Sequence, residues 1–190
     1  MPDQIQEQIQ EHQKTTEKML KKSFIRKIEK SVEWIIEAYK NNKKTLWAGN
    51  GGSSSDCLHA VGEFVGRFKM ERKALPALTL GSEMATNTAI SNDYGFEKIF
   101  LRSLEALGQK GDVLIGLSTS GNSENIIQAF QRAKHLGIKT IALLGKDGGK
   151  LKNLADLEIT IPSFDTPRIQ EMHIMIIHII CDLVERELFS

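Results

Sequence analysis

The chain has 190 residues, enough for one domain with a full hydrophobic core and an additional helical segment. Its 25 basic and 24 acidic residues nearly cancel, which argues against broad binding to nucleic acid or to an anionic membrane. The two cysteines form no disulfide framework, and the N-terminus has no apolar secretion signal. The most apolar window, 174–180, is too short to span a bilayer. We therefore expect a cytoplasmic protein that binds neither nucleic acid nor membranes.

Residues 1–43 are rich in Gln, Glu and Lys, and their apolar side chains recur at roughly helical spacing. This pattern predicts two helices, or one broken helix, between residues 3 and 42. The first part has little apolar surface to bury by itself. We expect it to pack on the rest of the chain or on another copy, and a solvated arm is the alternative.

From residue 44 onward, short apolar strands alternate with helices. The predicted strands are 45–48, 77–80, 113–117, 140–144 and 157–161. The predicted helices are 54–67, 83–90, 96–107, 124–136 and 167–188, with a loop at 91–95. Near-continuous apolar strands separated by helices indicate a parallel sheet covered on both faces. We divide the chain into a helical segment, 1–43, and an α/β domain, 44–190.

Two of the predicted strands lead into loops crowded with Gly, Ser and Asn. These loops are Gly49-Asn50-Gly51-Gly52-Ser53-Ser54 and Ser118-Thr119-Ser120-Gly121-Asn122-Ser123. At the carboxyl ends of parallel strands, such loops present backbone N–H groups and hydroxyls at a helix N-terminus, which suits a phosphate. A helix cap at Ser123 explains one serine but not four hydroxyls, so we interpret the second loop as ligand-binding.

Known nucleotide-binding patterns fit these loops poorly. The first loop begins like GxGxxG, but Ser54 replaces the third glycine and no well-placed acidic residue follows the next strand. Gly145-Lys146-Asp147 lacks the ending of a P-loop. A nicotinamide dinucleotide site is therefore not expected.

Two helices contain polar side chains that could perform chemistry. His59 and Glu63 are four residues apart and share a helix face, where they could bind a divalent metal or act as acid and base, although surface His–Glu pairs are common. His178 interrupts a stretch that we expect to be buried nearly all round, and a core histidine bonded to a backbone carbonyl is the ordinary interpretation. Spacing alone favours Glu171 over Gln170 as its companion.

Taken together, the motifs resemble the phosphoheptose isomerase family, the sedoheptulose 7-phosphate isomerases among the sugar-isomerase (SIS) domain proteins. The resemblance runs from about residue 20 to the end. Its parts are Gly49-Asn50-Gly51-Gly52-Ser53, His59-x-x-x-Glu63, Asn92-Asp93-Tyr94-Gly95-Phe96, Ser118-Thr119-Ser120-Gly121-Asn122-Ser123, and Arg168-Ile169-Gln170-Glu171-Met172-His173 with His178. It implies a three-layer α/β/α sandwich with a five-stranded parallel sheet and an N-terminal helical arm. It also implies a homotetramer with active sites at subunit contacts.

The resemblance further implies a set of site residues and a reaction. Zinc would be held by His59, Glu63, Gln170 and His178, which overrules the spacing argument for Glu171. A sugar-phosphate substrate would be bound by Asn50, Gly51, Gly52, Glu63, Asn92, Asp93, Ser118, Thr119, Ser120, Ser123 and Gln170. Glu63, with His178 as its acid–base partner, would move a proton between C1 and C2. D-sedoheptulose 7-phosphate would become D-glycero-D-manno-heptose 7-phosphate, on the route to heptoses of lipopolysaccharide or surface glycans.

One departure and three alternatives remain. Some family members carry an acidic residue just before the Arg-Ile-Gln motif, where this chain has Pro167; Asp165 is a possible replacement. A non-catalytic relative that binds the bacterial replication initiator resembles the stretch from Arg168 to His173, but the set of His59, Glu63 and His178 favours the enzyme. A sugar-phosphate-sensing regulatory module and an isomerase of another sugar phosphate are the remaining alternatives.

Overall fold

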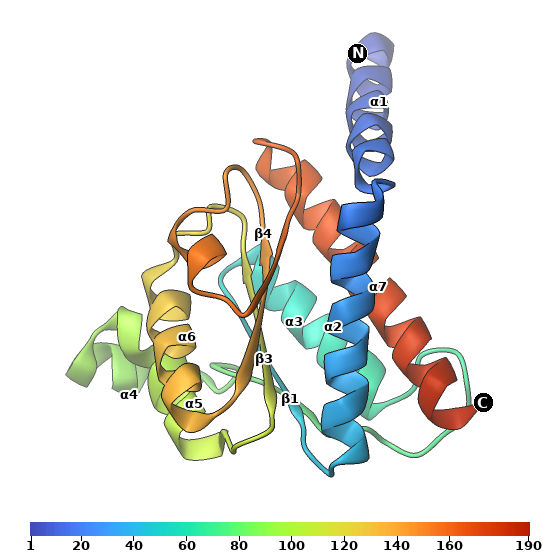
Figure 1. Ribbon diagram of the computed structural model, residues 1–190. Helices are drawn as coiled ribbons and strands as arrows, with labels where there is room; N and C mark the ends of the chain where they lie inside the picture. The colour runs from blue at the N-terminus through green and yellow to red at the C-terminus, as the bar shows by residue number, and fades with distance from the viewer.

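Five short apolar segments form one parallel sheet. We describe the protein from a computed structural model that covers residues 1–190 (Figure 1). The strands are β1 (Thr45–Gly49), β2 (Ala77–Thr79), β3 (Val113–Ser118), β4 (Lys139–Leu144) and β5 (Leu157–Thr160), and their order in the sheet is β2-β1-β3-β4-β5. All four neighbouring pairs are parallel, as the near-continuous apolar runs predicted.

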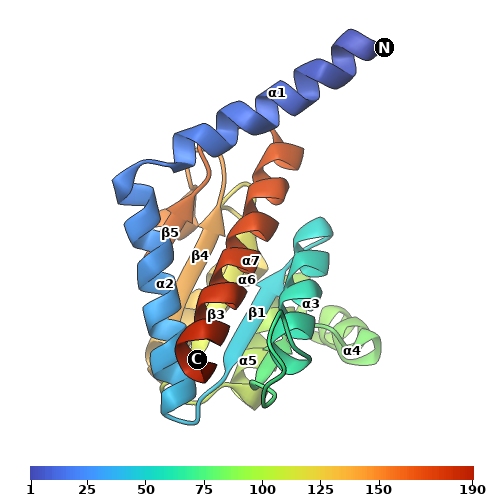
Figure 2. The ribbon, with the colours of Figure 1, turned by 90° about the vertical axis from the view of Figure 1, so that its right-hand side faces the viewer.

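Helices cover both faces of this sheet, which confirms the three-layer sandwich. They are α1 (Pro2–Met19), α2 (Lys22–Lys40), α3 (Gly52–Val65), α4 (Met84–Tyr94), α5 (Ile99–Leu107), α6 (Glu124–Leu136) and α7 (Thr166–Phe189). Short 3₁₀ turns occupy η1 (Phe96–Lys98) and η2 (Lys150–Asn153). Helices α2, α3 and α7 pack on one face and α5 and α6 on the other (Figures 1 and 2).

The strands supply both hydrophobic cores because successive side chains point to opposite faces of a sheet. Trp47, Ile115 and Leu143 join the α2–α3–α7 core, whereas Leu46 and Leu114 join the α5–α6 core. Every residue of β1 and β3 is buried. The two central strands are therefore rigid supports for the loops that follow them.

The order of the strands reverses between β1 and β3. From β1 the chain moves outward to β2, then crosses to β3 on the other side of β1. The connections leaving these two adjacent strands diverge, and in open parallel sheets such a point leaves a crevice that binds ligands. Both Gly- and Ser-rich loops lie there, as predicted.

The N-terminal segment forms two helices, α1 and α2. Helix α2 belongs to one layer of the sandwich, while α1 extends beyond the body of the protein (Figures 1 and 2). His12 Nδ1 lies 2.8 Å from a carboxylate oxygen of Glu171, which ties α1 to α7. Ile5 and Ile9 on α1 are 57% and 63% exposed. The arm is therefore docked at one end and leaves apolar side chains free.

The predicted loop at 91–95 is wrong. Helix α4 continues through Asn92 and Asp93 to Tyr94, and Gly95 ends it with φ of 95°. Glycine adopts this positive φ without the strain that other residues have, so the helix ends at Gly95 and not at the polar residues before it. The predicted helix 96–107 begins as the turn η1 before α5. Helix α4 buries none of its residues.

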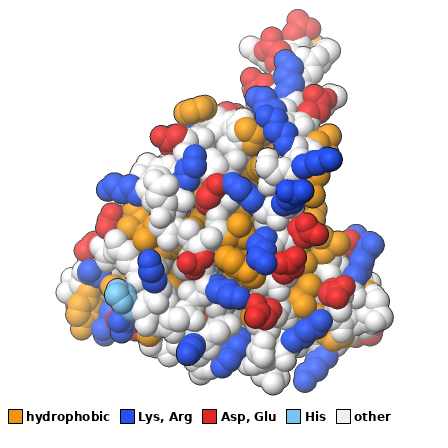
Figure 3. All heavy atoms as spheres, viewed as in Figure 1, with side chains coloured by type: hydrophobic (Ala, Val, Ile, Leu, Met, Phe, Trp, Pro, Cys, Tyr) orange, Lys and Arg blue, Asp and Glu red, His pale blue; other side chains and the backbone are white.

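Positive and negative side chains are intermixed over α1 and α2, with hydrophobic side chains visible between α2 and α7 (Figure 3). None of the helices combines the length and apolar character that crossing a bilayer requires.

Candidate metal centre and phosphate-binding loops

Three side chains from two helices meet at one point. The Nε2 atoms of His59 on α3 and His178 on α7 are 3.1 Å apart, and a carboxylate oxygen of Glu63 lies 3.0 Å from His59 Nε2. One donor atom from each residue lies within 4.8 Å of the other two. Helical spacing places His59 and Glu63 on one face of α3, and α7 packs beside that face. The structure thus brings together three of the four predicted ligands.

This donor set fits zinc. Imidazole nitrogens and carboxylate oxygens are ordinary zinc ligands, and catalytic zinc sites commonly use three protein ligands and leave a fourth position open. The two imidazoles face each other through Nε2, the arrangement expected of ligands that share one ion. His59 is exposed and the other two are half-buried, so the centre is open to a substrate.

Gln170, the fourth predicted ligand, borders this centre on the side of the loops. It lies two turns before His178 on α7, and its amide lies next to Gly52, at the start of α3. A Cβ on Gly52 would lie 2.5 Å from Gln170 Nε2, so only glycine fits there without movement. Ligation by Gln170 stays a prediction.

The structure corrects the expectation for His178. Helix α7 is not buried all round: His178 is half-buried, and the neighbouring Ile179 and Leu183 are 36% and 40% exposed. His173 has the core role instead. It is fully buried, and its Nε2–H donates to the carbonyl oxygen of Leu144 at 3.1 Å. Burial lowers the pKa of His173 to about 4, so its ring is neutral at pH 7.

Glu171, which spacing favoured as a companion of His178, points elsewhere. One of its oxygens contacts His12, and the other accepts a 2.7 Å hydrogen bond from Arg168. Asp165, the possible replacement for the acidic residue missing at Pro167, lies 3.9 Å from Arg168 Nε and is half-exposed. Neither carboxylate belongs to the three-donor centre.

The first loop turns sharply from β1 into α3. Gly51 has φ of 54°, a conformation that favours glycine, and no side chain caps the first turn of α3. The amides of Asn50 and Asn125 exchange two hydrogen bonds, of 3.0 and 2.9 Å, which hold this loop against α6. In the first turn of α3, the N–H groups of Ser53 and Ser54 donate to the carbonyl oxygens of Asn50 and Gly51, at 3.1 and 3.0 Å. The N–H groups of Gly51 and Gly52 make no such bond and are available to an anion.

The second loop holds its hydroxyls in a network. Ser118 Oγ lies 2.8 Å from Ser123 Oγ and accepts a 3.1 Å hydrogen bond from the N–H of Gly121. Ser123 does not cap α6 with its side chain, contrary to the ordinary interpretation of that residue. Ser120 Oγ accepts from the N–H of Asn122 at 3.2 Å, and Thr119 lies beside it, half-buried. The serine hydroxyls of this loop and the start of α6, which no side chain caps, thus lie together at the carboxyl end of β3.

Asn92 and Asp93 lie apart from both loops. They are exposed near the end of α4, where Asn92 Nδ2 donates to Asp93 Oδ1 at 2.8 Å. Helix α4 lies at the outer edge of the molecule, next to α5 and η1 (Figure 1). The structure therefore does not bring these two predicted residues into the three-donor centre of the same chain.

Sequence reasoning missed the residues that support the site from behind. The one sequence signal for Asn125 is that it is a polar residue in the first turn of α6, on a helix face that is otherwise apolar. Arg72 and Glu185 form a buried ion pair, with 3.2 Å between Arg72 Nε and a Glu185 oxygen. They are 113 residues apart, and no local pattern relates them.

Comparisons with known proteins agree with this geometry. The SIS domain family model matches residues 8–145. A phosphoheptose isomerase of Clostridium acetobutylicum is 53% identical over all of this chain and 97% of its own length. One from Helicobacter pylori strain P12 is 51% identical over 97% of this chain and 95% of its own. The solved phosphoheptose isomerase of Neisseria gonorrhoeae superposes with a TM-score of 0.92 at 35% identity, covering 97% of this chain and 98% of its own. The chain therefore belongs to the phosphoheptose isomerases of the SIS domain family.

Proposed function

We propose that this chain is a sugar-phosphate isomerase that interconverts D-sedoheptulose 7-phosphate and D-glycero-D-manno-heptose 7-phosphate. Relatives that are 51% and 53% identical over nearly the full chain are phosphoheptose isomerases. The observation that carries the proposal is the convergence of His59, Glu63 and His178 within 4.8 Å, beside loops suited to phosphate. Nothing in the comparisons supports a non-catalytic protein that binds the replication initiator.

The two parts of the site suit the two ends of a long sugar phosphate. The phosphate would accept hydrogen bonds from Ser118, Thr119, Ser120 and Ser123 and from the N–H groups of Gly51 and Gly52. Along α3, Gly52 and His59 are seven residues apart, which is about 10 Å at 1.5 Å per residue. Binding energy at the phosphate would position C1 and C2 at the far end, where the acid–base groups lie.

Zinc held by His59, Glu63 and His178, with Gln170 as the proposed fourth ligand, would supply Lewis-acid stabilisation of negative charge on substrate oxygen atoms. Glu63 takes the proton from one carbon and returns it to the other. His178 is the partnering acid–base group. Asn50, Asn92, Asp93 and Gln170 orient the hydroxyls of the substrate.

Glu63 has two roles that compete, because coordination lowers the basicity of a carboxylate. Its half-buried side chain, on the third turn of α3, has room to change partners. Movement between a liganding and a free position would allow it to act as a base. Its main chain does not move with it, since the Arg72 guanidinium donates to the Glu63 carbonyl oxygen at 2.8 Å.

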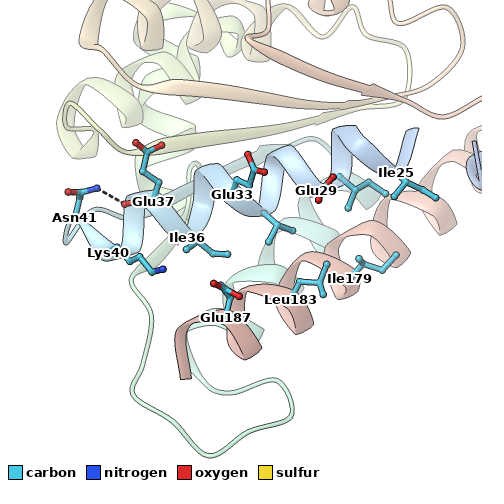
Figure 4. A pocket seen from close by; sticks show the side chains of 12 residues that line it. Ile25, Glu29, Glu33, Ile36, Glu37, Lys40, Asn41, Ile179, Leu183 and Glu187 are labelled. Carbon is cyan, nitrogen blue, oxygen red and sulfur yellow. Dashed lines mark hydrogen bonds between the residues drawn. The ribbon is translucent and has the colours of Figure 1, made fainter. Parts of the chain in front are cut away.

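We further propose that the active protein is a homotetramer. A groove of about 810 Å³ runs between α2 and α7 (Figure 4), where exposed apolar side chains lie beside charged ones. The apolar side chains along it include Ile25, Ile36, Ile179 and Leu183. Helix α4 buries no residue within the chain. Packing between copies would cover both surfaces, and it would allow Asn92 and Asp93 to reach a site on a neighbouring subunit. The product would enter the synthesis of lipopolysaccharide or surface-glycan heptoses.

The test is direct. Purified protein is incubated with sedoheptulose 7-phosphate, and formation of the aldose is followed by NMR before and after treatment with a strong chelator. We expect conversion that falls on metal removal and returns with zinc. Lack of conversion under every metal condition would contradict the proposed reaction, whereas full activity without any bound metal would remove zinc from it.

A further inference from the structure

The segment 66–76, between α3 and β2, is held in place by one buried arginine. The side chain of Arg72 is 2% exposed, and its guanidinium donates to the carbonyl oxygens of Glu63 and Phe64, both at 2.8 Å, and of Lys73 at 3.1 Å. The first two are carbonyls at the C-terminus of α3, which have no partner within the helix. Arg72 thus fastens this segment to the helix that bears His59 and Glu63.

Glu185 fastens the same segment to α7. Its carboxylate accepts hydrogen bonds from the N–H groups of Lys69 at 2.7 Å and Met70 at 3.0 Å, in addition to the contact with Arg72. The three contacts use both carboxylate oxygens of a side chain that is 2% exposed. The segment therefore bridges the two helices that supply the metal donors.

Phe68 stands on this bridge and touches one of those donors. Its ring centroid is 5.7 Å from that of His178, with 31° between the ring planes. The ammonium of Lys69 lies 5.2 Å from the Phe68 centroid and 3.1 Å from an Asp182 oxygen. Phe68 is half-buried and packs against the α2–α3–α7 core. Its position is thus fixed from several sides.

His178 needs such a neighbour. A liganding histidine is usually oriented by a hydrogen bond from its second ring nitrogen, and the torsion that turns an imidazole ring is otherwise broad. The hydrogen bond that the His178 ring makes within the chain is the 3.1 Å contact between its Nε2 and that of His59, the atoms that face the centre. Packing against the ring is therefore left to orient it. Two rings lie beside it, those of His59, with 5.0 Å between centroids, and Phe68, and Phe68 is the one that is not itself a proposed ligand.

We propose that Phe68 is a positioning residue that fixes the imidazole of His178 for metal binding, and that Arg72 and Glu185 hold Phe68 in place. The inference rests on the metal site of the proposed function. It adds that metal binding requires the packing of Phe68 against His178 as well as the ligands themselves.

The contact itself is tested without metal or substrate. The chain has five histidines, so their ring C–H resonances can be assigned by NMR. Phe68→Leu should shift the His178 resonances more than those of His12 or His135, whereas Phe68→Tyr, which keeps the ring, should leave them close to the wild type. Phe24→Leu is the matched control, because Phe24 is half-buried in the same core but lies on α2. Unchanged His178 resonances in Phe68→Leu would overturn the contact.

The consequence is tested by zinc affinity, measured by competition with a chelating dye. Phe68→Leu should bind zinc about tenfold more weakly, while Phe68→Tyr and Phe24→Leu stay near the wild type. Arg72→Lys should weaken binding in the same direction, because lysine cannot present the planar fork that ties the segment to α3. Wild-type zinc affinity in folded Phe68→Leu would overturn the positioning role. Loss of affinity in Phe68→Tyr to the level of Phe68→Leu would also overturn it.

The inference and the proposed reaction fail separately. If the wild type binds zinc but does not isomerise sedoheptulose 7-phosphate, the affinities of the variants still decide the role of Phe68. If the wild type isomerises the sugar and Phe68→Leu binds zinc like the wild type, the reaction stands and the positioning role falls. If Phe68→Leu does not fold, the zinc affinity of Arg72→Lys, which leaves Phe68 and the ligands unchanged, is compared with that of the wild type.

Discussion

Of the three residues at the proposed metal centre, His59, Glu63 and His178, Glu63 has two proposed roles, because it is both a ligand and the base. Replacing Glu63 with Gln keeps size and an oxygen donor but removes the base. We expect kcat to fall by about a thousandfold, the order of a lost general base, while KM changes much less. Steady-state kinetics with sedoheptulose 7-phosphate measure both. A comparable loss in kcat and in affinity would indicate that Glu63 is structural.

His173 makes the stability of the fold depend on pH. Its pKa is about 4 in the folded chain because burial disfavours the charged ring, against about 6.5 when unfolded. Between these values the unfolded chain takes up the proton, so stability is lost as pH falls from about 6.5 to about 4. The difference of the two values corresponds to about 3 kcal/mol.

Urea unfolding at pH 7.5 and pH 5 checks this expectation in the wild type and in His173→Gln. Glutamine can donate to the carbonyl of Leu144 but does not titrate, so the variant should lose less stability than the wild type on acidification. The difference between the stability losses of the two proteins removes the contribution of the carboxylates, which both proteins share. Equal losses in the two proteins would show that His173 is not the source.

At the scale of elements, the second loop depends on one glycine. Gly121 has φ of 67°, and a Cβ there would lie 2.0 Å from the carbonyl oxygen of Gly148. Gly121→Ala must therefore displace the loop that follows β3 and its hydroxyls. We expect KM for the sugar phosphate to rise about tenfold, with unfolding easier by at least about 1 kcal/mol.

Gly62→Ala serves as the control for this change. Gly62 lies within α3, and a Cβ there would meet nothing within 4 Å. The added methyl group should raise the free energy of unfolding by about 0.5–1 kcal/mol through helix propensity. If Gly121→Ala leaves KM unchanged, the serine loop does not bind the phosphate.

The sequence predicts strands and helices well where one signal dominates. Helix α6 begins and ends where its pattern predicted, and Gly137 ends it with φ of 69°. The boundaries fail where signals compete: the polar run of Asn92 and Asp93 suggests a loop, but the chain stays helical until Gly95. Local sequence cannot weigh a helix that buries no residue against a loop, because packing does not decide there.

At the scale of the whole molecule, contacts between distant segments were the least predictable part. The convergence of His59 and His178 came from resemblance to a family, since helix spacing favoured Glu171, which instead contacts His12. The predicted burial of His178 was also wrong, because His178 faces the neighbouring α3 and the core histidine is His173, which bonds to Leu144 of β4. Such outcomes depend on the rotation of α7 in its layer, and its nearly continuous apolar sequence leaves that rotation undetermined.

The groove between α2 and α7 leads to the last prediction. Leu183 on α7 is 40% exposed there and Ile25 on α2 is 49% exposed. Burying these side chains between copies would remove apolar surface from water at about 25 cal/mol per Å². Glu29, Glu33 and Glu187 already line the groove, so burying a further carboxylate there between copies would add like-charge repulsion to the cost of removing it from water. Leu183→Glu should therefore dissociate the proposed tetramer.

Light scattering coupled to size-exclusion chromatography measures the assembly at micromolar concentration. Leu107→Glu is the matched control, because Leu107 is 45% exposed at the end of α5, away from the groove. We expect a tetramer for the wild type and the control and a smaller species for Leu183→Glu. Isomerase activity should fall together with the assembly, because Asn92 and Asp93 do not reach the three-donor centre within one chain. A wild-type monomer with full activity would contradict both the tetramer and a site shared between subunits.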